Sequence, residues 1–343
     1  MEAAPEVRFA RTDDGVTIAY QVVGQGPPLV WMPSLSNIVA QWRVPVLRRA
    51  YQELTNHVTL VLYDGRGTGA SDRRIDTADL GVDAHVRDLT AVLGSAGIRT
   101  TSLLGYYHSV STAIAFAAAQ PERVQRMVLF GGAARLREAI SPQQTQALLS
   151  LVEQDWGLFA NAAAAAWLGW DDPESGRGVA EAFRTATTAT IAQAWFAAAQ
   201  QIDVTPMLGD VRAPTLVLHR QAEEQIPAEV ARRLATGLPN AQLLELPGTT
   251  PTLFIEDAES DLRLVSDFVT TGKAQRTSNR TILTPRERDV LKLLAAGESN
   301  GEIAKRLGIT VHTVERHSAN LYRKIGARGR TDAAAYALRH GLA

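Results

Sequence analysis

The sequence contains no cysteine, which excludes disulfide bonds, thiolate metal ligands and a cysteine nucleophile. Its histidines and carboxylates lack the spacing of metal ligands, so we expect neither a metal nor a cofactor. The opening stretch MEAAPEVRFARTDDG has no apolar segment of the kind that a signal peptide requires. No apolar run elsewhere is long enough to span a bilayer. These absences predict a soluble, cytoplasmic protein that acts without a membrane.

Charge is plentiful but unevenly distributed along the chain. Residues 281–343 hold 11 Lys and Arg against 6 Asp and Glu, whereas the remainder holds 24 against 30. A basic segment joined to an acidic body fits a module that binds a polyanion such as DNA. The length of 343 residues also favours two domains. We therefore expect a large domain over 1–271, a polar linker over 272–282 and a small domain over 283–343.

The small domain carries start and stop signals for a series of short helices. Thr284-Pro285-Arg286-Glu287 is a capping box with proline at the first helical position, and Ser299-Asn300-Gly301-Glu302 is a second box. Gly297 and Gly308 mark the ends of these two helices, and Thr310 can cap the next one. Two helices joined by a tight glycine turn have the geometry of a helix-turn-helix DNA reader.

The third predicted helix, 311–325, has two distinct faces. Val314, Ser318, Leu321 and Ile325 fall on one stripe and are expected to face the core. On the other face, Arg316 can bind a guanine edge through two hydrogen bonds, and Glu315 can accept from a cytosine amine. Basic side chains nearby are placed for phosphate contacts. The residues that we expect at DNA are Lys305, His312, Thr313, Glu315, Arg316, His317, Ala319, Arg323 and Lys324.

This segment resembles the LuxR-type DNA-binding domain. The matching residues are LTPRERDVLKLLAAGESNGEIAKRLGITVHTVERHSANLYRKIGARGRTDAAAYALRHGL, from 283 to 342. The resemblance implies an all-α four-helix domain whose third helix enters the major groove of double-stranded DNA and whose fourth helps to pair two copies. It implies Glu315, Arg316 and Ala319 at base edges, with Ala319 offering only a methyl group. We favour binding to a palindromic operator over the alternative of an interaction module with a solvated basic face.

The large domain alternates short apolar runs with helical segments. Runs at Pro28–Met32, Val58–Tyr63 and Val124–Phe130 predict buried strands, and the alternation predicts an α/β fold with a mostly parallel sheet covered on both faces. A helical insertion at about 141–200 predicts a lid, and it contains four of the six tryptophans. These tryptophans either line a pocket or pack the lid onto the sheet, and both roles stay open. They are Trp156, Trp167, Trp170 and Trp195.

Residues 6–271 resemble the α/β-hydrolase fold. The resemblance is carried by the stretch DGRGTGASD at 64–72, with support from Pro33-Ser34, from the joint LGYYHS at 104–109, and from VLHR and LPG further on. In that fold the joint carries a serine nucleophile on a strained turn. Here the resemblance places Tyr107 in the serine slot, Glu223 in the acid slot and Pro251 in the base slot. No histidine occurs between 220 and 311, so we expect a catalytically degenerate hydrolase domain.

The two resemblances together predict a transcription regulator that senses a small molecule and functions as a homodimer. We expect the ligand to lie near Ser34, Tyr106, Tyr107, His108 and the four lid tryptophans, unless Tyr107 fills the cavity. An active esterase or lyase joined to a DNA-binding domain is the alternative, in which Ser109 and His108 replace the lost groups. A ligand-blind scaffold is the third class. Alanines 333, 334, 335 and 337 either pair two copies or pack within their own domain.

Overall fold

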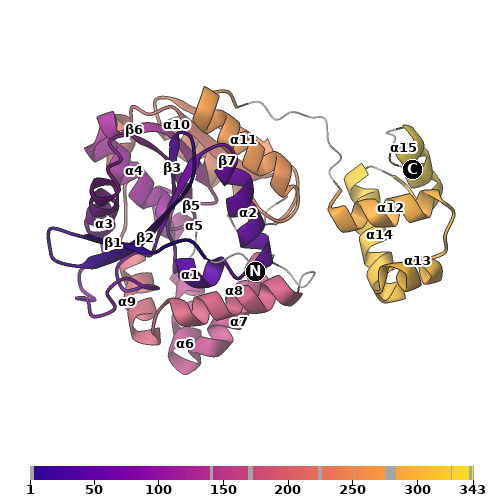
Figure 1. Ribbon diagram of the computed structural model, residues 1–343, viewed down its shortest axis with the longest axis horizontal. Coiled ribbons are helices and arrows are strands. Elements are labelled where there is room, and N and C mark those ends of the chain that lie inside the picture. Colours follow the sequence, from indigo (N-terminus) through magenta and orange to yellow (C-terminus); the bar gives the residue numbers. More distant parts are fainter. Residues whose placement is uncertain are drawn as a thin grey trace. The chain divides into compact units, whose positions relative to one another are not determined.

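The computed structural model describes residues 4–139, 142–168, 173–222, 226–250, 252–274, 283–325, 327–339 and 342. The chain divides into two compact units, residues 1–276 and 277–343 (Figure 1). Trp170, Glu223, Pro251 and most of the expected linker lie outside the described residues. Within the described residues, no helix combines the length and the apolar character that a bilayer crossing requires.

The large unit is built on an eight-stranded sheet in the order β1-β2-β4-β3-β5-β6-β7-β8. The first two pairings, β1 with β2 and β2 with β4, are antiparallel, and all later pairings are parallel. Every residue of the central strand β5 is buried, as expected where helices cover both faces of a parallel sheet. The predicted α/β fold class is thus confirmed. The strands are β1 Arg8–Arg11, β2 Thr17–Gly24, β3 Pro28–Trp31, β4 Thr59–Tyr63, β5 Thr101–Tyr106, β6 Val124–Phe130, β7 Thr215–Arg220 and β8 Ala241–Leu246.

Helices cover both faces of this sheet (Figure 1). On one face α2 packs against α11, and on the other α3 packs against α4, while α10 lies on β7 and β8. Each face has its own apolar core, one containing Leu54 and Val265 and the other containing Leu89 and Ile114. The helices are α1 Ile38–Gln41, α2 Pro45–Thr55, α3 Val82–Ser95, α4 Ser109–Ala119, α5 Leu136–Ala139, α10 Ala228–Gly237 and α11 Ala258–Thr271, with 3-10 turns η1 Pro121–Arg123 and η2 Thr205–Asp210.

Four helices form the insertion that the sequence predicts between β6 and β7. They gather on one side of the large unit (Figure 1), with α7 packed against both α6 and α8. Helix α8 also contacts α1 and α2, so the insertion closes over the part of the sheet where β3 ends. The Thr188 side chain accepts from the Ile191 N–H and thereby starts the last of the four. The helices are α6 Pro142–Gln154, α7 Trp156–Leu168, α8 Pro173–Ala186 and α9 Ala189–Ala199.

The small unit contains α12 Pro285–Ala295, α13 Asn300–Leu307, α14 Val311–Ile325 and α15 Arg330–Arg339. Both predicted capping boxes are present, because each N-cap side chain accepts from the N3 backbone and each N3 glutamate accepts in return. Gly308 ends α13 in the left-handed conformation, with a φ of 66°. The four helices share one core, which includes Val290, Ile303, Val314 and Leu321.

Candidate functional site

The turn between β5 and α4 is the most strained point of the described backbone. Tyr107 has a φ of 50° and is the single non-glycine residue of the described chain with a positive φ. This conformation is unfavourable for a bulky side chain, so surrounding contacts must enforce it. The Tyr107 N–H donates to the Phe130 carbonyl at 3.0 Å, and the Val110 N–H donates to the Tyr107 carbonyl at 3.2 Å. The strand-to-helix turn is therefore sharp, and it carries a phenol.

The Tyr107 ring is packed into the core of the large unit. Its side chain is 7% exposed, and its ring centroid lies 4.9 Å from that of Tyr106. The ring also lies over Gly131, where an added Cβ would stand 3.1 Å from Tyr107 Cε2. Gly131 itself has a φ of 63°, so this position requires glycine for two reasons. Tyr107 does not line either of the two interior cavities described below.

Ser109 at the start of α4 is engaged with the backbone of the same turn. Its hydroxyl accepts from the Tyr106 N–H and donates to the Tyr106 carbonyl, both at 2.9 Å. The residue is 4% exposed. Both functions of the hydroxyl are thus used in joining the end of β5 to α4.

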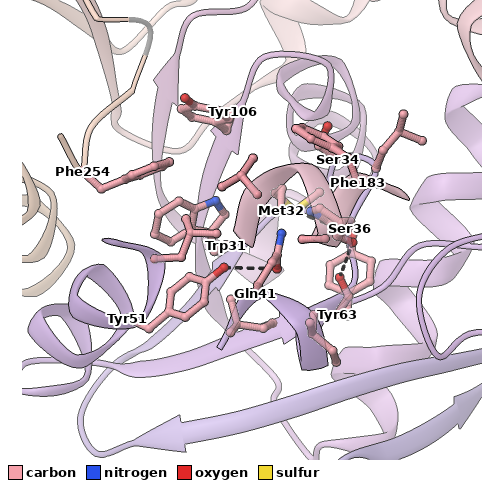
Figure 2. A pocket seen from close by; sticks show the side chains of 17 residues that line it. Trp31, Met32, Ser34, Ser36, Gln41, Tyr51, Tyr63, Tyr106, Phe183 and Phe254 are labelled. Carbon is pink, nitrogen blue, oxygen red and sulfur yellow. Dashed lines mark hydrogen bonds between the residues drawn. The ribbon is translucent and has the colours of Figure 1, made fainter. Parts of the chain in front are cut away.

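An interior cavity of about 60 Å³ lies between the sheet and the lid. Figure 2 shows aromatic rings around it, with Tyr106 and Phe254 on one side and Phe183 on another. Tyr106 comes from β5, Phe183 from the lid helix α8 and Phe254 from the loop after β8. Its other walls are apolar or uncharged and are formed by Trp31, Met32, Pro33, Ser34, Leu35, Ser36, Ile38, Gln41, Leu47, Tyr51, Leu62, Tyr63, Val179 and Ala182.

Two hydroxyl groups at the first cavity are hydrogen-bonded to other residues of its wall. The Tyr51 hydroxyl donates to Gln41 Oε1 at 3.2 Å, and the Ser36 hydroxyl donates to the Tyr63 carbonyl at 3.4 Å (Figure 2). Burial, and secondarily the charge of Asp64, raises the pKa of Tyr51 above its usual value, so this hydroxyl stays protonated. The first cavity therefore offers apolar surface and no charged side chain among its described walls.

A second cavity of about 30 Å³ adjoins the first. The two share Met32, Pro33, Ser34 and Tyr63, and His108, Arg66 and Trp195 are among the further residues of the second. The His108 ring centroid lies 4.5 Å from that of Trp195. Burial, and secondarily the charge of His85, lowers the pKa of His108 to about 3, so the imidazole is neutral at physiological pH. Neither ring nitrogen has a hydrogen-bond partner in the described chain.

The predicted ligand-binding residues thus divide between the two cavities and the surrounding core. Ser34 lines both cavities, Tyr106 lines the first, and His108 and Trp195 line the second. Sequence reasoning missed the other rings of the first cavity, because their convergence depends on tertiary packing. The missed rings are Trp31, Tyr51, Tyr63, Phe183 and Phe254.

Trp156 lies in the lid away from both interior cavities. Its Nε1 donates to the Arg184 carbonyl at 3.1 Å, and its ring stacks on Phe159 with centroids 5.2 Å apart. It therefore packs two lid helices together, which differs from both roles that the sequence left open, lining a pocket or packing the lid onto the sheet. The Trp167 side chain and all of Trp170 lie outside the described residues.

The loop after β8, in which the resemblance places the base slot, is held by a buried arginine at the end of β7. Arg220 and Asp261 are both fully buried, and Arg220 Nη2 lies 2.7 Å from Asp261 Oδ2. The guanidinium also donates to the carbonyls of Pro247 at 2.9 Å, Thr250 at 3.3 Å and Thr252 at 2.5 Å. Sequence reasoning did not single out Arg220, although a cation at the end of the apolar run TLVLH is an available signal.

The predicted DNA-contacting residues mostly lie on one exposed face of the small unit. Val314, Ser318 and Leu321 are buried, which agrees with the predicted two faces of α14. Thr313 and His317 are half-buried at the margins of the exposed face. The side chains that are exposed are Lys305, His312, Glu315, Arg316, Ala319 and Arg323.

Lys324 departs from the role that the sequence suggested. Its Nζ donates to Glu287 Oε2 at 2.9 Å, and the two side chains are 19% and 3% exposed. The ammonium is thus engaged inside the domain, where it pairs with the glutamate of the first capping box. The opposite case is Val311, which begins α14 and is 45% exposed although sequence reasoning did not place it at DNA.

Two of the four alanines in α15 pack within their own domain. Ala333 and Ala337 have no exposed surface and belong to the core of the small unit. Ala334 is half-buried, and Ala335 is exposed, as is Leu338 at 72%. Any contact between two copies through this helix must therefore use its outer face.

Comparison with known proteins assigns each unit. Residues 281–337 match the family of bacterial regulatory proteins called the luxR family, and residues 27–258 match the alpha/beta hydrolase fold family. The transcriptional regulatory protein MctR of Rhizobium johnstonii is 53% identical over 60 residues, which cover 18% of this chain and only 28% of that relative. The putative carbamate hydrolase RutD of Azorhizobium caulinodans is 25% identical over 253 residues, covering 69% of this chain and 91% of the relative.

Solved structures agree on the fold of the large unit. The enol-lactonase from Burkholderia xenovorans LB400 superposes with a TM-score of 0.66 at 21% identity, covering 77% of this chain and all of that one. The α/β-hydrolase match extends over more than half of the chain, and the luxR match covers nearly all of the small unit. The chain therefore belongs to the α/β-hydrolase fold family and carries, in addition, a DNA-binding domain of the bacterial luxR family.

Proposed function

We propose that this protein is a transcription regulator whose α/β-hydrolase unit binds a small molecule and does not catalyse hydrolysis. The observation that carries this proposal is Tyr107 on the strained turn after β5. A phenol ring packed over Gly131 and against Tyr106 does not present a nucleophile to a substrate. The fold therefore keeps a site while the chemistry is lost, because fold and function are separable.

The neighbouring groups support the same proposal. Ser109, the alternative nucleophile, has its hydroxyl engaged with the Tyr106 backbone in both directions. His108 is a weak base, because burial lowers its pKa to about 3, and its nitrogens contact no serine. The sequence has no histidine between 220 and 311 to serve as another base. Loss of the nucleophile or base of a triad lowers turnover by about a millionfold.

Regulation requires that the ligand distinguish two arrangements of the protein. A molecule enclosed between the sheet and the lid contacts α8 and β5 together, so its binding energy can favour one packing of the lid. We propose that this packing alters how a homodimer presents two small units to a palindromic operator. The exposed outer face of α15, with Ala335 and Leu338, offers surface for the pairing of two copies.

Hydrolysis is tested with a panel of activated esters. We expect the protein and its Ser109→Ala variant to give the same rate, equal to that of the buffer. Turnover at an ordinary enzymatic rate that disappears in Ser109→Ala would instead support an active esterase or lyase. Circular dichroism of both proteins controls for folding, because the Ser109 hydroxyl joins β5 to α4.

DNA reading is tested by footprinting on a selected operator. Arg316→Ala is expected to lower site-specific affinity by about tenfold to a hundredfold, because a bidentate contact to a base edge is lost. Arg232→Ala is the matched control, since Arg232 is an exposed arginine on α10 of the large unit. Unchanged site-specific footprint protection in Arg316→Ala would show that α14 is not the helix that reads the bases. Sedimentation of the complex should give two protomers for each operator.

A further inference from the structure

The two ring nitrogens of His108 are buried polar atoms that the rest of the described chain leaves unpaired, while the residue as a whole is half-buried. Both ring nitrogens are inaccessible to solvent and lack a hydrogen-bond partner. Trp195 and Phe196 pack against the ring at centroid distances of 4.5 and 6.0 Å, and the residue lines the second cavity. Buried polar groups are nearly always hydrogen-bonded, so an unpaired imidazole at a cavity wall indicates a position for a hydrogen-bonding ligand.

The charges near this cavity do not favour an anion. Arg66 is the one permanently charged residue among its described walls, and its side chain is 2% exposed. Its guanidinium donates to Asp14 and Asp79 at 2.9 Å each and to Asp88 at 2.9 and 3.0 Å. Arg87 also pairs with Asp14, so three carboxylates face two guanidinium groups. His85, the other wall residue that can carry a positive charge, lies with its Nδ1 3.9 Å from Asp88 Oδ2. An anionic ligand would therefore lose its hydration here and meet cations that already have carboxylate partners.

The protonation of His108 points to an uncharged ligand group. Because its pKa is lowered to about 3 by burial and by His85, the imidazole is neutral and offers one N–H donor and one nitrogen acceptor. A hydroxyl or a carboxamide can donate to one and accept from the other. A cationic group would have to leave water for a cavity whose nearby carboxylates are already bound by Arg66.

The first cavity sets the nature of the remainder of the ligand. It shares the wall residues Met32, Pro33, Ser34 and Tyr63 with the second, and its described walls carry no charge. Figure 2 shows rings such as Trp31 lining it. Volumes of about 60 and 30 Å³ correspond together to roughly six to nine water-sized positions, which is about the size of one substituted ring.

We infer that the α/β-hydrolase unit binds a small uncharged molecule with one ring-sized apolar body and one hydroxyl or carboxamide group. The polar group pairs with His108 in the second cavity, and the apolar body lies among the aromatic rings of the first. This inference rests on the proposed sensory function, because it names the ligand class for the same site.

The test uses matched probes on the full-length protein. Benzyl alcohol and benzamide carry the proposed polar groups. Toluene carries no polar group, benzoate carries a negative charge, and benzylamine carries a positive charge. We expect calorimetry to give both neutral polar probes an affinity at least about tenfold higher than the other three. Trp195 fluorescence should report binding, because the indole lies beside His108.

His108→Phe keeps a ring and removes both nitrogens. It is expected to bring the affinity for benzyl alcohol down to that for toluene, whereas His57→Gln, a change at an exposed histidine, should leave it unchanged. A second measurement does not depend on the variant's folding. In the unaltered protein, benzyl alcohol should shift the nitrogen resonances of the His108 imidazole and leave those of His57 in place.

Several results would overturn the ligand class. These are equal binding of a charged probe, benzyl alcohol affinity that survives in a folded His108→Phe protein, unshifted His108 resonances at saturation, or no binding by either neutral polar probe. Each of these leaves the sensory function standing with a ligand of another kind. Failure of the proposed function has a different signature, which is serine-dependent ester turnover.

Discussion

The buried pair of Arg220 and Asp261 makes a sharp prediction about stability. Arg220→Met removes a charge from a position with no solvent exposure and takes the cation of the buried ion pair away from Asp261. It also leaves the carbonyls of Pro247, Thr250 and Thr252 without their donor. Breaking a buried ion pair from one side costs about 3–5 kcal/mol, and we expect Arg220→Met to lie at the upper end because of the carbonyls.

A double-mutant cycle separates the pair from the carbonyl contacts. Asp261→Leu removes the carboxylate partner of the Arg220 guanidinium and should lower the free energy of unfolding by about 3–5 kcal/mol. It keeps the guanidinium as a donor to the loop carbonyls. With both changes the stranded charge disappears while the carbonyls remain unpaired. The double variant should therefore be more stable than the sum of the two single losses predicts, by about 2–3 kcal/mol.

Urea unfolding followed by tryptophan fluorescence is a suitable assay. All six tryptophans lie between residues 31 and 195, so the signal reports the large unit and is insensitive to the small one. Far-UV circular dichroism follows both units and shows whether the transitions separate. A coupling energy below about 0.5 kcal/mol would refute the view that Arg220 and Asp261 stabilise each other as a buried pair.

Three further predictions concern other sites. Gly131→Ala should destabilise the large unit by about 1–2 kcal/mol in urea unfolding, because the φ of Gly131 is 63° and an added Cβ would press on the Tyr107 ring. An unchanged urea midpoint would contradict this prediction. Burial raises the pKa of Asp64 from 3.8 to about 6, so the folded state holds a proton that the unfolded state releases, and unfolding free energy should fall by about 3 kcal/mol as pH rises through this interval. The prediction would be refuted if the folded protein bound no more protons than the unfolded protein between these two pH values. Lys324→Ala should speed amide hydrogen exchange in α14, because it removes the ion-pair partner of buried Glu287. Lys305→Ala, at an exposed position, should leave amide exchange unchanged and should reduce the slope of log affinity for DNA against log salt concentration by about 0.9. The opposite pattern would show that Lys305 is the structural lysine and Lys324 the phosphate contact.

The small unit was predictable in detail because its signals are local. Each capping box spans four residues, and the stop at Gly308 follows from the left-handed conformation that ends α13. The period of buried residues along α14 also comes directly from the spacing of apolar side chains. The ion pair of Lys324 was not predicted, because its partner Glu287 lies 37 residues earlier and no local pattern records that pairing.

The large unit was predictable in its strands and in its turn, but not in the directions of its side chains. Alternating apolar runs indicate the order of strands and helices, and the resemblance to the α/β-hydrolase fold places Tyr107 at the joint between β5 and α4. They do not show whether the ring points into a cavity or over Gly131, which follows β6. The partners of Arg220 are similarly distant, since they lie 27 to 41 residues away on a loop and a helix. Tertiary packing decides which of two neighbouring groups a side chain contacts.

The hydrogen bonds from Arg220 to the loop after β8 also bear on the proposal that the large unit is not a hydrolase. A serine restored at Tyr107 would meet a loop whose carbonyls already point at a fixed cation. An imidazole added to that loop would have to become positively charged during acyl transfer while standing near this guanidinium. Under the proposal that the large unit does not hydrolyse esters, a serine at Tyr107 alone is therefore not expected to give turnover while Arg220 holds this loop.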